Sequence, residues 1–203
     1  MKVTTKIKCI QFPCQDIDKN SYVIPIHDID VEKIRILMIT EAPPNETADY
    51  FYSAGNPLYL QTVLQVFKDA GSDVSSMQDI LDLGVYITTA IKCGKKQYAI
   101  SPETMKNCSK LLEQELALFP AIKVFMLMGD VAIKMMNDIW KKQTGNKVIP
   151  SGSTYKIRGN VYYAGDKRVF PSYTPAGKNF LIEKSKRRMV AEDIREALRC
   201  LIS

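Results

Sequence analysis

Five cysteines and one isolated carboxylate are the side chains best suited to chemistry in this chain of 203 residues. The only histidine is His27, which excludes a multi-histidine metal site and leaves little scope for a histidine-based triad. The N-terminus, MKVTTKIKC, lacks the apolar stretch of a secretory signal. An odd number of cysteines in such a chain favours metal or cluster ligation over disulfides. A cysteine is also a good small core residue, and we expect Cys200 to pack in a terminal helix.

The isolated carboxylate is Glu41, within the stretch IRILMITEAPP at 34–44. An apolar run that ends in Thr40, Glu41 and two prolines is typical of a buried strand followed by a turn. Ligands of open parallel sheets bind outside the carboxyl ends of the strands, so Glu41 is a candidate site residue. A turn carboxylate also often does no more than accept hydrogen bonds from nearby backbone N–H groups. From these residues alone, the second interpretation is the default.

The elements that would position Glu41 alternate between strands and helices. Strands are predicted at 34–40, 85–91 and 124–128, with a final hairpin at 161–164 and 168–170. Helices are predicted at 60–70, 101–118, 129–142 and 183–202, and the segment 145–159 is predicted to be a polar connector. This order predicts an α/β fold, a three-layer α/β/α domain with a short, mostly parallel central sheet. We expect one domain over 1–203, in which 1–33 form an N-terminal segment that carries the first cysteine pair.

Four loops are expected to meet at the carboxyl ends of these strands. They are the segments 40–44, 88–93, 128–129 and 170–173. Because loops that converge at one sheet edge are the usual place for a binding site, this edge is the default site hypothesis.

Charge and hydropathy limit the partners. A hydrophobic fraction of 46% is ample for a core, and no apolar run reaches the length of a membrane span. We therefore expect a cytoplasmic protein that has no membrane partner. The net charge of +6 suits a polyanion, although a basic surface with no such partner is an equally open interpretation.

Several short motifs, in order, resemble the uracil-DNA glycosylase superfamily, and most closely its iron–sulfur class, often called family 4. The motifs of that class are Gly-Glu-x-Pro-Gly, Gly-x-Pro-Phe, Tyr-Ile-Thr-Asn-x-x-Lys-Cys and His-Pro-Ser. They are matched here by TEAPP at 40–44, GNPL at 55–58, YITTAIKC at 86–93 and FPS at 170–172. A helix with a further cysteine, Cys108, and a Gly-to-Ala turn at 129–132 lie between the last two.

The resemblance implies a DNA glycosylase, which extrudes a damaged base into a pocket and hydrolyses its N-glycosidic bond. Glu41 would orient or deprotonate water and stabilise the positive charge of the sugar. The substrate-binding positions implied by the motifs are Ala42, Pro43, Leu58, Thr89, Phe170 and Ser172.

Three of these positions differ from the family pattern. Thr89 replaces an Asn that reads the base, Leu58 replaces a stacking Phe, and Phe170 replaces a His that stabilises the departing anion. Threonine has one rotatable hydroxyl, leucine has no π-face, and phenylalanine donates no hydrogen bond. The sequence therefore predicts either a less polar target base or a catalytically inactive nucleic-acid-binding protein on the same fold.

The resemblance also implies a [4Fe–4S] cluster as cofactor. Its ligands would be Cys9, Cys14, Cys93 and Cys108. The first pair is Cys-x4-Cys, where the family usually has Cys-x2-Cys. A third hypothesis, a redox or sensor module, predicts a cluster without affinity for DNA.

DNA, single-stranded or duplex, is the implied partner, and no obligate protein partner is evident. An apolar wedge is expected at Phe180 and Leu181, flanked by cations that bind phosphates. The cations are Lys178, Lys184, Lys186, Arg187 and Arg188. A solvated helix start is the alternative interpretation of this basic run.

Overall fold

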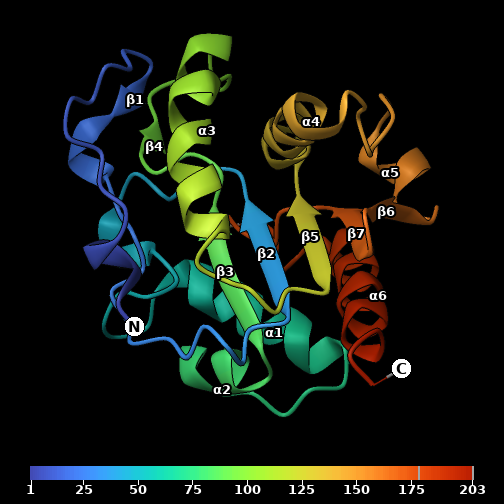
Figure 1. The fold of residues 1–203 in the computed structure, drawn as a ribbon. Helices are drawn as coiled ribbons and strands as arrows, with labels where there is room; N and C mark the ends of the chain where they lie inside the picture. The colour runs from blue at the N-terminus through green and yellow to red at the C-terminus, as the bar shows by residue number, and fades with distance from the viewer. Residues whose placement is uncertain (178, 203) are drawn as a thin grey trace.

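A five-stranded sheet in the order β3-β2-β5-β7-β6 forms the centre of the molecule (Figure 1). The computed structural model describes residues 1–177 and 179–202. The strands of this sheet are β2 (Ile36–Thr40), β3 (Val85–Thr89), β5 (Val124–Met128), β6 (Tyr162–Ala164) and β7 (Lys167–Ser172). The first four in spatial order are parallel, and β6 is antiparallel to β7 at the edge. The predicted mostly parallel sheet and final hairpin are both confirmed.

Helices cover both faces of the sheet (Figure 1). Helices α3 (Pro102–Leu116) and α4 (Asp130–Thr144) pack together, as do α1 (Leu58–Asp69) and α6 (Lys184–Arg199). Every residue of β2, β3 and β5 is buried, which explains why these strands are continuous apolar runs rather than alternating ones. The predicted three-layer α/β/α architecture is therefore confirmed. Among the described residues, no helix has the length and the apolar character needed to cross a membrane.

Two short helices were not predicted. Helix α2 (Met77–Asp82) begins with a capping box in which the Ser76 hydroxyl accepts from Asp79 N–H and the Asp79 carboxylate accepts from Ser76 N–H. Helix α5 (Thr154–Ile157) lies within the segment predicted to be a polar connector. Both helices are too short for a periodic apolar pattern to be visible in the sequence. Single 3₁₀ turns also occur at Val3–Thr5, Lys19–Ser21 and Thr47–Asp49.

The N-terminal segment is attached to the region that follows β3. Strand β1 (Ile17–Asp18) pairs with β4 (Gly94–Lys95) in a two-stranded antiparallel ribbon. The Asp16 carboxylate accepts hydrogen bonds from Ser101 N–H at 2.6 Å and from the Thr104 hydroxyl. Burial opposes ionisation of Asp16, but these hydrogen bonds outweigh it and lower the pKa of the carboxyl. The ribbon and Asp16 thus fix the first cysteine pair beside β4 and the start of α3.

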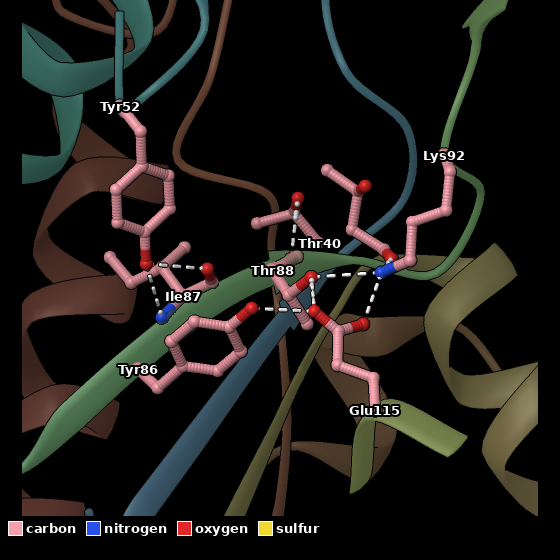
Figure 2. A network of polar contacts seen from close by, with 8 residues as sticks. Thr40, Tyr52, Tyr86, Ile87, Thr88, Lys92 and Glu115 are labelled. Carbon is pink, nitrogen blue, oxygen red and sulfur yellow. Dashed lines mark hydrogen bonds and ion pairs between the residues drawn. The ribbon is translucent and has the colours of Figure 1, made fainter. Parts of the chain in front are cut away.

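A buried ion pair joins the carboxyl end of β3 to α3 (Figure 2). The Lys92 ammonium contacts the Glu115 carboxylate, and each side chain is 1% exposed. The ammonium also donates to the Thr88 hydroxyl at 2.9 Å and to Thr89 O at 2.5 Å. The Glu115 carboxylate accepts from the Tyr86 hydroxyl at 2.5 Å and from the Thr88 hydroxyl at 2.9 Å. All three ammonium protons therefore have acceptors, which is the condition for burying a charged lysine.

Burial raises the pKa of Tyr86 well above its ordinary value, and the negative charge of Glu115 raises it further. Tyr86 therefore stays protonated at neutral pH and donates to Glu115. A second tyrosine braces the same strand, because the Tyr52 hydroxyl donates to Ile87 O at 2.8 Å and accepts from Ile87 N–H at 3.3 Å (Figure 2).

Glu115→Gln should lower the free energy of unfolding by about 3–5 kcal/mol, because it leaves the Lys92 ammonium buried without a counter-charge. Glu113→Gln, two residues earlier on α3, is the matched control. Glu113 pairs with Lys142 at 3.3 Å on the surface, and its loss should cost at most about 1 kcal/mol. Urea denaturation of both variants measures the difference. Equal losses would show that the buried pair contributes no more than an exposed one.

Candidate functional site

The carboxyl ends of β2, β3, β5 and β7 lie side by side, as predicted. Thr40 is in register with Thr89, and Met128 with Ser172. The loops continue this contact, because Ile91 N–H donates to Glu41 O and Gly129 N–H donates to Ser172 O, both at 2.9 Å. From β2 the chain moves to β3 on one side and then returns to β5 on the other. Glu41 therefore stands at the point where the strand order reverses, the usual ligand position in open α/β sheets.

Two groups hold the Glu41 carboxylate. Lys95 Nζ of β4 lies 2.7 Å from Oε2, and Val131 N–H in the first turn of α4 donates to Oε1 at 3.2 Å. The Lys95 ammonium and the positive end of the helix both favour a negative charge here. The side chains of Glu41 and Lys95 are 24% and 27% exposed, so the pair is accessible from solvent.

Glu41 opens on a cavity of about 580 Å³. The β2, β5 and β7 loops supply Glu41, Gly129, Tyr173 and Thr174 to its wall. The rest of the wall comes from α5, the segment before α6, and α6 itself, and it includes Ser153, Thr154, Ala176, Asn179, Phe180, Glu183 and Lys186. Tyr98 lines the cavity from the loop that follows β4. Motif matching did not identify Tyr98 or Thr174 as site residues. An aromatic residue within the polar loop KKQY was the available signal for Tyr98.

Close packing at Gly129 brings the walls of this cavity together. A Cβ atom at Gly129 would lie 2.8 Å from Glu41 Cγ, 2.8 Å from Glu41 Oε1 and 2.6 Å from Thr174 Oγ1. The residue also has a φ of +105°, which a side chain disfavours. The Thr174 hydroxyl in turn donates to Met128 O at 2.6 Å. Only glycine therefore lets α4 begin against the Glu41 carboxylate.

Phe170 and Ser172 lie in β7 and are buried outside the cavity wall. The Arg168 guanidinium lies 4.3 Å from the centre of the Phe170 ring. The Ser172 hydroxyl donates to the Asp193 carboxylate of α6 at 2.5 Å. Burial raises the pKa of Asp193, although its bonds to Arg158 and Ser172 oppose this. Ser172 thus connects β7 to α6, and neither Ser172 nor Phe170 lines the cavity on which Glu41 opens.

The other predicted substrate residues are near the sheet edge but are not in the cavity wall. Ala42 is half-buried and Pro43 is buried. Leu58 begins α1, where its N–H donates to the Asp49 carboxylate at 3.2 Å. Thr89 ends β3, and its fully buried hydroxyl has no hydrogen-bond partner among the described residues. Of the predicted catalytic and substrate-binding residues, the structure places only Glu41 in the wall of the cavity.

The predicted DNA-binding cations have different surroundings. Lys186 lines the cavity and lies 2.7 Å from Glu183, and Lys184 is exposed at the start of α6. Arg187 Nε lies 2.7 Å from Asp69 and so connects α6 to α1, whereas Arg188 is 77% exposed and lies 3.8 Å from Glu192. Lys178 lies outside the described residues.

The side chains predicted to form an apolar wedge, Phe180 and Leu181, are not the exposed apolar residues of this segment. Phe180 is buried, with 4% of its surface exposed, and Leu181 is half-buried. Ile182, with 76% exposed, is the large apolar side chain that projects from this segment. Phe180 was expected to form the wedge because the family resemblance places this loop in the DNA, but its ring is buried.

The four predicted cluster ligands lie in one region. Cys14, Cys93 and Cys108 are buried and Cys9 is half-buried. Burial, followed by the neighbouring thiols, raises the pKa of Cys93 to about 12, and burial raises the pKa of Cys108 to about 11. Four thiols are the donor set of a cluster, and their mutual influence shows that they are near one another. In the described part of the chain, no group of three His, Cys, Asp or Glu side chains is placed so that it could hold a metal ion as it stands.

The open, mostly parallel α/β sheet with a carboxylate at its switch point is the arrangement found in ligand-binding α/β proteins. The family model of the uracil DNA glycosylase superfamily matches residues 27–198, and the chain belongs to this superfamily.

A type-5 uracil-DNA glycosylase from Thermus thermophilus is 24% identical over 180 residues, which cover 86% of this chain and 80% of the relative. The crystal structure of wild-type UNG from Nitratifractor salsuginis aligns over 80% of this chain and 73% of its own, with 13% identity and a TM-score of 0.37. The superfamily predicted from the motifs is confirmed, and its iron–sulfur class stays a prediction.

Gly129→Ala should destabilise the protein more than Gly145→Ala, at the other end of α4. Both glycines have positive φ, so backbone strain costs roughly 1–3 kcal/mol in each variant. A Cβ at Gly145 has no heavy atom within 4 Å, whereas one at Gly129 meets Glu41 and Thr174. This overpacking should add about 1–3 kcal/mol for Gly129→Ala. Urea denaturation measures both, and equal losses would mean that the Glu41 region moves aside freely.

Proposed function

We propose that this protein is a DNA glycosylase that hydrolyses the N-glycosidic bond of a flipped-out damaged base. The observation that carries the proposal is the position of Glu41. It opens on a cavity of about 580 Å³ at the switch point of the sheet, in a chain that belongs to the uracil DNA glycosylase superfamily. A flipped nucleotide requires a concave site of about this size.

Glu41 would act on the sugar. As the bond between C1′ and the base nitrogen breaks, its electron pair leaves with the base and positive charge develops on the sugar ring. A fixed carboxylate stabilises that charge. Water then adds to C1′, and its proton passes to Glu41 or to the departing base. Lys95 occupies one position on Oε2 and Val131 N–H one on Oε1, so each oxygen keeps a lone pair that can accept this proton.

The proposed target is a base less polar than uracil. The motifs alone support this target, because Thr89, Leu58 and Phe170 offer fewer hydrogen bonds and less stacking than the family residues at those positions, and all three lie outside the cavity wall. DNA phosphates would contact the exposed cations at the start of α6, Lys184, Lys186 and Arg188. Arg187 is assigned a structural role, because it already pairs with Asp69.

Glu41→Gln should lower the excision rate by roughly 10²–10⁴-fold, because the amide neither accepts a proton nor balances the charge on the sugar. Glu46→Gln is the control, since Glu46 is exposed and its side chain caps no helix. Single-turnover assays would use single-stranded and duplex oligonucleotides that carry uracil, hypoxanthine or other damaged bases. An excision rate that Glu41→Gln leaves unchanged would show that Glu41 has no role in the reaction.

A second candidate function is nucleic-acid binding without chemistry. The observation that favours it is that both Glu41 oxygens already have partners. In that case no base is excised, yet DNA still binds. The logarithm of its binding constant should then fall linearly with the logarithm of the salt concentration. Binding that is absent, or insensitive to salt, would argue against both functions.

We propose further that Cys9, Cys14, Cys93 and Cys108 hold a [4Fe–4S] cluster that fastens the N-terminal segment to α3. The proximity of the four thiols supports this proposal. The absence of a preformed metal site in the described residues means that the thiols must move closer to ligate iron. Clustered free cysteines that serve only as core residues are the alternative.

Protein purified without oxygen should contain about four iron and four sulfide per chain, the composition of the cluster. Cys93→Ser should remove most of both, whereas Cys200→Ser, in the last turn region after α6, should retain them. Iron and sulfide analysis with visible absorption measures this. Protein that contains no iron would show that the four cysteines are packing residues.

A further inference from the structure

Tyr98 is an exposed aromatic residue at the edge of the cavity. Its side chain is 98% exposed, yet it is part of the wall that contains Glu41. Single exposed apolar residues are ordinary on protein surfaces and need no explanation. An aromatic ring that is solvated and also lines the candidate active site is different, because a molecule that occupies the cavity can contact it.

The backbone that carries Tyr98 is fixed on both sides. Before it, Lys96 N–H donates to Asp16 O at 3.2 Å, and Lys95 pairs with Glu41. After it, Ser101 N–H donates to the Asp16 carboxylate and Ile100 is buried. The ring therefore projects from a held loop, so little backbone entropy is lost when a ligand stacks on it.

The charges around Tyr98 indicate the chemistry of the ligand. Lys95 and Lys96 precede it in the chain, and Lys186 also lines the cavity. An exposed aromatic ring beside cations is the combination that binds single-stranded nucleic acid, in which the bases stack and the phosphates are neutralised. A protein partner would be expected to cover a contiguous apolar patch, whereas Gln97 and Lys96 next to Tyr98 are polar and exposed.

We propose that Tyr98 forms a second nucleobase subsite, on which an unpaired base next to the reacting nucleotide stacks. This inference rests on the proposed function, because it assumes that a nucleotide occupies the cavity beside Glu41. It adds the expectation that the protein binds a damaged base more tightly when the neighbouring base is unpaired. In a duplex the neighbouring base is already stacked and paired, so Tyr98 gains less from it.

The test measures binding rather than cleavage and uses the full-length Glu41→Gln protein as parent. The probe is a single-stranded oligonucleotide with one damaged base and 2-aminopurine as its neighbour, compared with the same strand in a duplex. Fluorescence anisotropy gives Kd, and 2-aminopurine quenching reports stacking. Tyr98→Ala should bind the single strand roughly 5- to 150-fold more weakly and lose the quenching. Tyr98→Trp should retain both, and the loss should be smaller in the duplex.

Tyr163→Ala is the matched control, since Tyr163 is 58% exposed on β6 and is not part of this cavity wall. A Tyr98→Ala variant that binds and quenches like its parent would overturn the subsite alone. Weakening without any change in quenching would overturn it as well, since the contact would not be a stacked base. A parent that binds no oligonucleotide would overturn the proposed function, and the subsite with it.

Discussion

The buried ion pair between Lys92 and Glu115 is the interaction on which the geometry of the site depends. It fixes the turn after β3 to α3, and that turn leads directly into Cys93 and β4. A charged pair at 1% exposure is tolerated because every ammonium proton has an acceptor. The Tyr86 and Thr88 hydroxyls also donate hydrogen bonds to the carboxylate. A hydrophobic pair of similar volume would be about as stable, so the value of this one lies in the single position it specifies.

The segment from β4 to the start of α3 carries most of what distinguishes the site. It supplies Lys95 to the Glu41 carboxylate and Tyr98 to the cavity wall. Contacts with the N-terminal segment hold it in place, through the pairing of β4 with β1 and the hydrogen bond from Ser101 N–H to the Asp16 carboxylate. The N-terminal segment therefore acts on the site indirectly, because it holds the loop from which two site residues project.

The contacts of Glu41 hold its carboxylate in one orientation. Both of its oxygens are used, and Gly129 allows α4 to begin in contact with it. A carboxylate held in one orientation is preorganised for a developing positive charge. In the proposed reaction, each oxygen keeps a lone pair that can accept from a reacting water, because Lys95 and Val131 N–H take one position each.

The sequence by itself determined the layers, the parallel strands, the main helices and the place of Glu41, because buried apolar runs and helical periodicity are local patterns. The short helices α2 and α5 were too brief to show such a pattern. Only the tertiary structure decided where side chains point. Ser172 turns to Asp193, 21 residues later, and Arg187 turns to Asp69. Phe180 enters the core and Tyr98 stays in solvent. The hydrogen-bond and ion-pair partners come from elements far away in the sequence. Which aromatic side chain is buried depends on tertiary packing, which local sequence patterns do not predict.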